Sequence, residues 1–243
     1  MNRNDFRLLH RLRVRWVEVD LKKIVFNGHY LMYFDTAMAD YWRALAVPYE
    51  DTMHQLGGDL YVKKASLEYH ASAQYDDMLE VGLRCQRIGN SSIQFMGGIF
   101  CGDQLLITGE LLYVYANPHT KTSMPVPPVL RETMLGFEAG EAVTTLETGS
   151  WAHLQDKAMP VRMQVFVQEQ GVDAQYELDE MDEGAVHAVI TNRFGQPLGT
   201  ARLFEKSLGV AQIGRMAVVR AMRGSGLGIQ LLQALVEMAQ TRG

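Results

Sequence analysis

The feature that most constrains the fold is a long helical pattern followed by a series of short alternating stretches. Between Tyr30 and Leu45, apolar residues recur at three- and four-residue steps, which is typical of the buried face of a helix. Four stretches then read as strands: residues 60–69, 78–88, 93–101 and 105–115. Their short connections favour antiparallel hairpins, and Gly97-Gly98 indicates a bulge or a close backbone approach. One helix beside such a sheet predicts an α+β domain with the helix lying on the sheet.

The stretch from Arg15 to Phe34 carries the first candidate site. We expect it to begin as a strand, to pass through a polar turn with Glu18 and Asp20, and to open a helix near Asn27. The first N–H groups of a helix have no intrahelical partner and favour negative charge. A carboxylate facing them would suit acyl transfer, since the N–H groups can hold an oxyanion while the carboxylate attacks or activates water. The alternative is that Asp20 is only a turn or capping residue.

The same stretch resembles the active-site segment of the hotdog-fold acyl-CoA thioesterases of the 4-hydroxybenzoyl-CoA and YbgC/FadM type. The residues that fit this pattern are Trp16, Glu18, Asp20, Lys23, Ile24, Val25 and Tyr30. The resemblance implies that Asp20 is the catalytic carboxylate, that the Asn27 backbone N–H is the oxyanion donor, and that Tyr30 belongs to the site. Glu18 and Lys23 depart from the usual Asp and Gly. The resemblance also includes Tyr75-Asp76-Asp77, covers residues 10–139, and implies a homodimer or homotetramer with sites at subunit boundaries.

Composition narrows the functional classes. The formal net charge of −5 gives no support for a nucleic-acid-binding surface. The two cysteines cannot staple a chain of 243 residues, so nothing suggests an oxidising compartment. We find no apolar run long enough for a membrane span or a signal peptide, and therefore expect a cytoplasmic protein. We also expect no metal site.

The second half predicts a separate domain at residues 151–243, joined to the first domain (1–139) by a linker at 140–150. A helix is expected at residues 160–168, with Pro160 in its first turn. The acidic run from Tyr176 to Glu183 is expected to be a solvated loop or, alternatively, a surface that attracts a cationic amine. Strands are expected at residues 185–191, 198–204 and 212–219.

A glycine-rich turn follows the last of these strands and precedes a helical pattern at residues 229–239. In such a turn, backbone N–H groups can approach a phosphate, and the following helix start favours its negative charge. The turn fits neither the Walker A spacing nor the dinucleotide-binding spacing. It does fit the R-x-x-G-x-G motif of the GNAT acyl-CoA N-acyltransferases, through Arg223, Gly226 and Gly228.

The second half also resembles the ElaA-like branch of the GNAT family in residues 161–172, 199–203 and 213–218 and in His187. The resemblance implies an acyl-CoA N-acyltransferase that uses coenzyme A or acetyl-CoA as a substrate and holds no tightly bound cofactor. The implied coenzyme A-binding residues are Met216, Ala217, Val218, Arg223, Gly224, Ser225, Gly226, Leu227 and Gly228. Glu169 and His187 are candidate bases for an amine acceptor; the alternatives are a solvated Glu169 and a buried, structural His187. Because the sequence ends at Gly243, we expect a partial mixed α/β GNAT domain.

Taken together, the sequence predicts a fusion enzyme. The first domain would hydrolyse acyl-CoA thioesters, and the second would transfer an acetyl group to an amine or retain coenzyme A binding. Two alternatives stay open: a non-catalytic coenzyme A sensor, and a thioesterase for acyl groups on acyl carrier protein.

Overall fold

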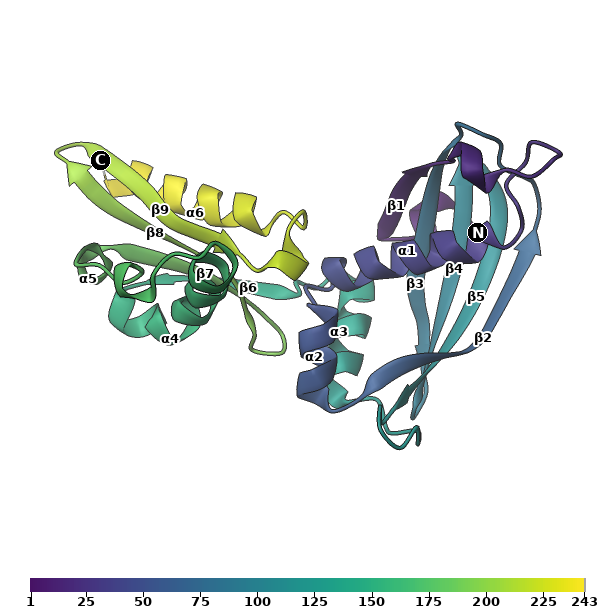
Figure 1. The fold of residues 1–243 in the computed structure, drawn as a ribbon, viewed down its shortest axis with the longest axis horizontal. Helices are drawn as coiled ribbons and strands as arrows, with labels where there is room; N and C mark the ends of the chain where they lie inside the picture. The colour runs from purple at the N-terminus through teal and green to yellow at the C-terminus, as the bar shows by residue number, and fades with distance from the viewer. Residues whose placement is uncertain (243) are drawn as a thin grey trace. The chain divides into compact units, whose positions relative to one another are not determined.

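The computed structural model describes residues 1–242, which divide into two compact units (Figure 1). The first unit comprises residues 1–45 and 49–141, and the second comprises residues 46–48 and 142–242. The predicted linker at 140–150 is wrong for its middle part, because Thr144–Gly149 forms strand β6. This strand lies at a sheet edge and is only half-buried, so it lacks the apolar alternation by which a strand is recognised.

The first unit is an antiparallel five-stranded sheet with strand order β1-β3-β4-β5-β2. The strands are β1 (Leu8–Arg13), β2 (Asp59–Tyr69), β3 (Met78–Ile88), β4 (Ser92–Cys101) and β5 (Gln104–Ala116). Helix α1 (His29–Ala44) crosses the sheet, as Figure 1 shows. The predicted α+β arrangement of one long helix on an antiparallel sheet is therefore confirmed.

Phe34 seats α1 on this sheet in a notch made by two glycines. Gly97 of β4 and Gly109 of β5 are cross-strand partners, and the Phe34 ring, which is fully buried, fills the space above them. A Cβ atom on Gly97 would lie 2.2 Å from Phe34 Cε1, and one on Gly109 would lie 2.7 Å from Phe34 Cε2. The close approach that Gly97-Gly98 predicted is thus the seat of the helix.

Two local elements of the first unit differ from the prediction. Trp16–Glu18, expected as strand, forms a 3-10 helix because the Glu18 side chain accepts the Arg15 backbone N–H and closes a capping box. Helix α2 (Tyr49–Leu56) was not predicted. Helix α3 (Pro128–Ala139) follows β5, and a further 3-10 turn spans Arg3–Asp5.

The second unit is a four-stranded antiparallel sheet with strand order β6-β7-β8-β9, flanked by helices (Figure 1). Its other elements are α4 (Trp151–Arg162), α5 (Met181–Gly184), β7 (Val186–Asn192), β8 (Pro197–Ser207), β9 (Val210–Val218), α6 (Leu227–Arg242), and 3-10 turns at Ala174–Tyr176 and Arg220–Met222. Successive side chains of β7 point to opposite faces of the sheet. Ile190 packs with Leu231 of α6, whereas its neighbour Val189 packs with Leu154 of α4.

The prediction that a helix begins at Pro160 is wrong. Pro160 lies in the last turn of α4, and the chain continues as a π-helix over Met163–Glu169. Proline cannot donate a backbone hydrogen bond, so the regular α-helical ladder is already interrupted where the π-helical turn follows. Within residues 1–242, no helix combines the length and apolar character that a membrane crossing requires.

Candidate active sites

Asp20 lies at the tip of a tight hairpin that precedes α1. Val19 and Val25 pair across the hairpin, the Lys23 N–H donates to the Asp20 carbonyl (2.9 Å), and the Phe26 N–H donates to the Glu18 carbonyl (2.9 Å). Lys23 adopts a left-handed conformation (φ 63°), which explains why this turn position suits a glycine. The Asp20 carboxylate is half-buried and accepts a hydrogen bond from the Lys22 backbone N–H at 2.7 Å, within the same turn.

Asn27 and Tyr30 lie at the start of α1 but in different surroundings. Asn27 is exposed, and its carbonyl accepts a long hydrogen bond from the Tyr69 hydroxyl (3.4 Å). Tyr30 is buried, and its hydroxyl accepts the Ala73 N–H at 2.9 Å. Burial raises the pKa of Tyr30, so the phenol stays neutral. The geometry gives Tyr30 a structural contact of its own, while a catalytic role for any of the three predicted residues remains a prediction.

Glu18 is the residue of this segment that sequence reasoning underestimated. Its carboxylate is buried and accepts hydrogen bonds from the Arg15 side chain (2.6 and 2.8 Å), the Arg15 backbone N–H (2.7 Å) and the Tyr33 hydroxyl (2.9 Å). Burial opposes ionisation, but these donors hold the pKa of Glu18 below its ordinary value. Glu18 therefore joins the hairpin to α1. The spacing Arg15-x-x-Glu18 was the available signal.

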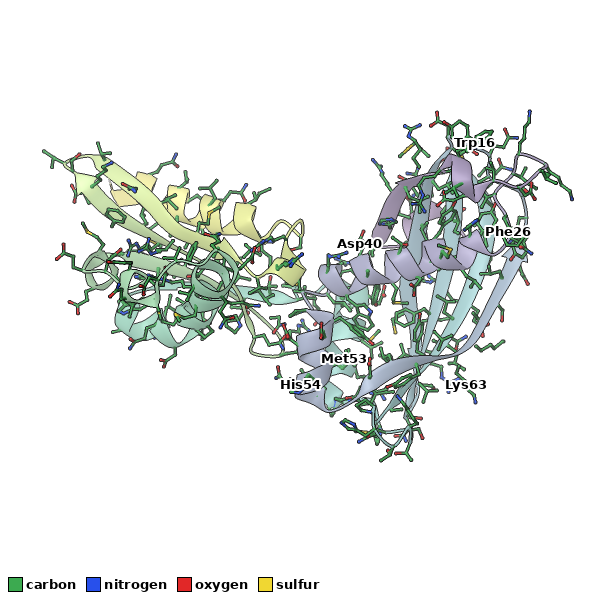
Figure 2. The ribbon with its side chains drawn as sticks, viewed as in Figure 1. Trp16, Phe26, Asp40, Met53, His54 and Lys63 are labelled. Atoms are coloured by element: carbon green, nitrogen blue, oxygen red, sulfur yellow. The ribbon has the colours of Figure 1, made fainter. Side chains whose placement is uncertain are left out.

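Exposed aromatic side chains surround this hairpin. Trp16 is 69% exposed and contacts Tyr75 edge-to-face, with ring centroids 5.4 Å apart. Phe26 is also exposed, and Figure 2 shows Trp16 and Phe26 at the end of the first unit where α1 begins. A cluster of exposed large apolar side chains is typical of a surface that binds a ligand or another chain.

In the second unit, β9 carries a bulge beside the predicted cofactor strand. Thr200 pairs with Ala217 and Arg202 pairs with Gly214, so two residues of β9 oppose one of β8. The first of the two, Arg215, has φ 47°. A bulge removes backbone groups from the regular ladder. The bulge therefore frees a polar position on the edge strand directly before Met216, Ala217 and Val218, of which Ala217 is buried and Met216 is exposed.

The glycine-rich turn begins with an arginine that joins three elements. The Arg223 guanidinium makes a two-pronged ion pair with Glu169, with both N···O distances at 2.7 Å, and its Nε donates to the Val218 carbonyl at 3.1 Å. The turn therefore connects the end of β9 with the π-helix. Gly226 has φ 85°, and α6 begins at Leu227, which brings the helix start next to the turn.

The two candidate bases are both engaged. The ion pair with Arg223 lowers the pKa of Glu169, so its carboxylate remains ionised and bound. His187 is buried, its Nε2 lies 2.9 Å from the Asp182 carbonyl, and its ring packs against Trp151 at a tilt of 45°. Burial lowers the pKa of His187, which keeps the imidazole neutral. The contacts of His187 therefore support its structural alternative, whereas Glu169 is exposed and held in an ion pair.

The acidic run is only in part the solvated loop that was expected, since Glu180 and Glu183 are exposed but other members are not. Glu177 and Asp182 are buried, and both are bound by Arg162 of α4, which is itself fully buried. An arginine outside the run therefore neutralises these two carboxylates, which the charge of the run alone could not predict.

Comparison with known proteins supports both halves of this description. The thioesterase superfamily model matches residues 22–108, and the acetyltransferase (GNAT) family model matches residues 150–243. The chain therefore joins a segment that matches the thioesterase superfamily (the thioesterase segment) to one that matches the GNAT family (the GNAT segment). A Synechocystis sp. protein named as an esterase is 27% identical over 127 residues, which cover 51% of this chain and 76% of the relative.

Two further relatives correspond to one segment each. A Bacillus subtilis protein named as an uncharacterized N-acetyltransferase is 34% identical over 86 residues; the match covers 35% of this chain and only 60% of the relative. The crystal structure of a DHNA-CoA thioesterase from Staphylococcus aureus superposes with a TM-score of 0.50 at 21% identity, covering 56% of this chain and 95% of that one. This superposition shows the hotdog fold of the thioesterase segment. Among the described residues, no group of three or more His, Cys, Asp or Glu side chains is placed to hold a metal ion.

Proposed function

We propose that the thioesterase segment hydrolyses acyl-CoA thioesters and that the GNAT segment transfers the acetyl group of acetyl-CoA to an amine. The observation that carries the proposal is the pairing, in one chain, of two segments whose families both use coenzyme A thioesters. Acyl-CoA and acetyl-CoA would be substrates, with no tightly bound cofactor. The non-catalytic sensor and the carrier-protein thioesterase remain the alternatives that the tests below address.

In the thioesterase segment, we assign the Asp20 carboxylate as nucleophile or general base and the Asn27 backbone N–H as oxyanion donor. The carboxylate attacks the thioester carbonyl carbon, or removes a proton from the attacking water. The N–H at the start of α1 stabilises the negative charge that develops on the carbonyl oxygen. By either route, water supplies the oxygen of the product acid, and coenzyme A leaves as its thiol. Glu18 holds the hairpin and α1 in register for this step.

In the GNAT segment, we assign the N–H groups of residues 224–228 to the pyrophosphate of coenzyme A and residues 216–218 to its pantetheine arm. The positive φ of Gly226 and the adjacent start of α6 support the first assignment. The bulge at Arg215 supports the second, because an edge strand with a disrupted ladder offers free backbone groups.

We also propose a homodimer or homotetramer formed through the thioesterase segment, in the cytoplasm. Strand β2 lies at a sheet edge, and exposed aromatic residues surround the Asp20 hairpin. Both cysteines, Cys85 and Cys101, are free thiols, which suits a reducing compartment.

The test of the hydrolase is a panel of acyl-CoAs assayed with wild type, Asp20→Asn and the matched control Asp51→Asn, whose side chain is exposed on α2. We expect Asp20→Asn to lose about 10²-fold or more in kcat and Asp51→Asn to keep wild-type rates. Equal rates for the two variants would remove Asp20 from the mechanism. Presenting the same acyl group on acyl carrier protein distinguishes the two carriers, and coenzyme A binding without any turnover would favour the sensor.

A further inference from the structure

The segment between the π-helix and β7 has an inverted distribution of polar and apolar side chains. Its large apolar residues face solvent: Tyr176 is 68% exposed, Leu178 49% and Met181 46%. Two of its acidic residues turn inward, with Glu177 only 1% exposed and Asp182 only 2%, whereas Glu180 and Glu183 are exposed. Soluble proteins usually do the opposite, so an exposed apolar group of this kind marks a binding surface. We call Tyr176, Leu178 and Met181 the apolar ridge.

Arginines from two other elements hold the inward-facing carboxylates. Arg162 Nε donates to Glu177 at 2.5 Å, and Arg162 Nη1 donates to Asp182 at 2.7 Å. Arg202 of β8 binds Asp182 at 2.7 Å and Asp179 at 2.6 and 2.7 Å. Three of the acidic side chains are therefore already neutralised within the unit. They cannot serve as the recognition site for a cationic amine.

A third arginine connects the apolar ridge to the β9 bulge. Arg215, the bulge residue with φ 47°, donates to the Tyr176 carbonyl (3.0 Å), the Glu177 carbonyl (3.2 Å) and Asp179 Oδ2 (3.1 Å). The ridge is thus anchored to β9, the strand to which the pantetheine arm of coenzyme A is assigned.

The protonation state of the acceptor follows from the surrounding groups. An ammonium ion must lose its proton before nitrogen can attack a thioester, and a nearby carboxylate would instead stabilise the charged form. Glu169 is bound to Arg223 and His187 is buried against Asp182, so neither candidate base is open to an incoming amine. An apolar surface beside which three carboxylates are already bound by arginine suits an amine that arrives uncharged.

We propose that the acceptor of the GNAT segment is an aromatic amine that is neutral at pH 7 and that binds with its ring on the apolar ridge. This inference rests on the proposed acetyl transfer and names its substrate class. The amine nitrogen attacks the thioester carbon, the C–N bond forms, and the C–S bond breaks. The proton lost from nitrogen ends on the coenzyme A thiol, so the products are the aryl acetamide and free coenzyme A.

The test compares two isomeric amines, 4-methylaniline and benzylamine, with spermidine as a polycation. The first is neutral at pH 7.5, whereas benzylamine has the same atoms but is protonated. N-acetylated product is quantified by mass spectrometry, because thiol release alone would include hydrolysis by the thioesterase segment. We expect kcat/KM for 4-methylaniline to exceed that for both cationic amines. Preference for benzylamine or spermidine would overturn the proposal and would indicate recognition by the exposed carboxylates of Glu180 and Glu183.

Matched variants locate the binding surface. Leu178→Gln removes apolar surface from the ridge, and Leu208→Gln makes the same change at a fully exposed leucine in the β8–β9 turn. We expect Leu178→Gln to raise KM for 4-methylaniline about five-fold, the size expected when the exposed half of a leucine is buried on binding. Leu208→Gln should match wild type, and both variants should keep the wild-type affinity for coenzyme A.

Failure of the ridge proposal can be distinguished from failure of the proposed acetyl transfer. Equal KM values for the two variants would overturn the role of the ridge while leaving acetyl transfer intact. Absence of coenzyme A binding and of product with every amine would overturn the proposed function of the GNAT segment itself. A wild-type chain that binds coenzyme A and acetylates only a protein substrate, with Leu178→Gln defective, would assign the ridge to a protein partner and refute the aromatic amine.

Discussion

Substituting Gly97 tests how α1 is seated and how its start is held next to the Asp20 hairpin. A Cβ at this position would lie 2.2 Å from Phe34 Cε1, whereas non-bonded carbon atoms prefer about 3.5–4.0 Å. The ring cannot move aside, since its other edge already contacts Gly109 and Phe34 is fully buried. Relief must come from a shift of α1 or of the sheet.

We expect Gly97→Ala to destabilise the first unit by about 3 kcal/mol, the upper end of the range for overpacked cores. Without a clash, the same change in a strand would be neutral or favourable by about 0.5–1 kcal/mol. Gly214→Ala in β9 provides that control, because the nearest atom to its added Cβ is Phe204 Cε1 at 4.0 Å. In a Phe34→Leu background the cost of Gly97→Ala should fall below about 1 kcal/mol, giving a coupling energy of about 2 kcal/mol.

The assay is urea denaturation, with the unfolding of each unit monitored by hydrogen exchange and mass spectrometry. Two compact units need not unfold together, so peptides from α1 must be read separately from peptides of the second unit. The reasoning is refuted if Gly97→Ala is as well tolerated as Gly214→Ala, or if Phe34→Leu leaves its cost unchanged.

Three further predictions concern charge and backbone geometry. Burial opposes ionisation of Asp182, but its contacts with arginine outweigh burial and lower its pKa to about 2. The stability that Asp182 provides is therefore present above its unfolded pKa and should be lost as pH falls from about 4 to 2. Acid denaturation of the second unit measures this loss. Gly226→Ala, at φ 85°, should weaken coenzyme A binding about ten-fold in calorimetry. Gly209→Ala, at φ 72° in the β8–β9 turn, should not, although it carries a similar backbone strain. Glu18→Gln should lower kcat for acyl-CoA hydrolysis about ten-fold with KM unchanged, since a neutral amide cannot retain every donor that now binds the carboxylate; unchanged kcat would make Glu18 dispensable.

The elements with local signals could be predicted from the sequence. β3 alternates and is bounded by turns, and α1 repeats apolar residues at helical spacing, so both follow from short-range pattern. Strand β6 and α4 could not be predicted in this way. β6 is a half-exposed edge strand without alternation, and α4 contains Pro160, which normally marks a helix start.

The candidate sites also differ in whether a local sequence signal predicts them. The Asp20 hairpin and the glycine-rich turn are continuous in sequence, so their residue types could be identified directly. The burial of Glu177 could not be predicted, because its partner Arg215 lies 38 residues away and no local pattern indicates such pairing. The apolar ridge could not be predicted for the same reason. Its exposure depends on which side chains of the segment face inward, and arginines distant in sequence determine this.

The central claim is that one chain binds coenzyme A thioesters at two separate sites. Isothermal titration of the full chain with coenzyme A tests it most directly, through the stoichiometry per chain. The account predicts two equivalents for wild type and one for Gly226→Ala under conditions where the weakened site is not filled. A single equivalent for wild type, unaffected by Gly226→Ala, would contradict it.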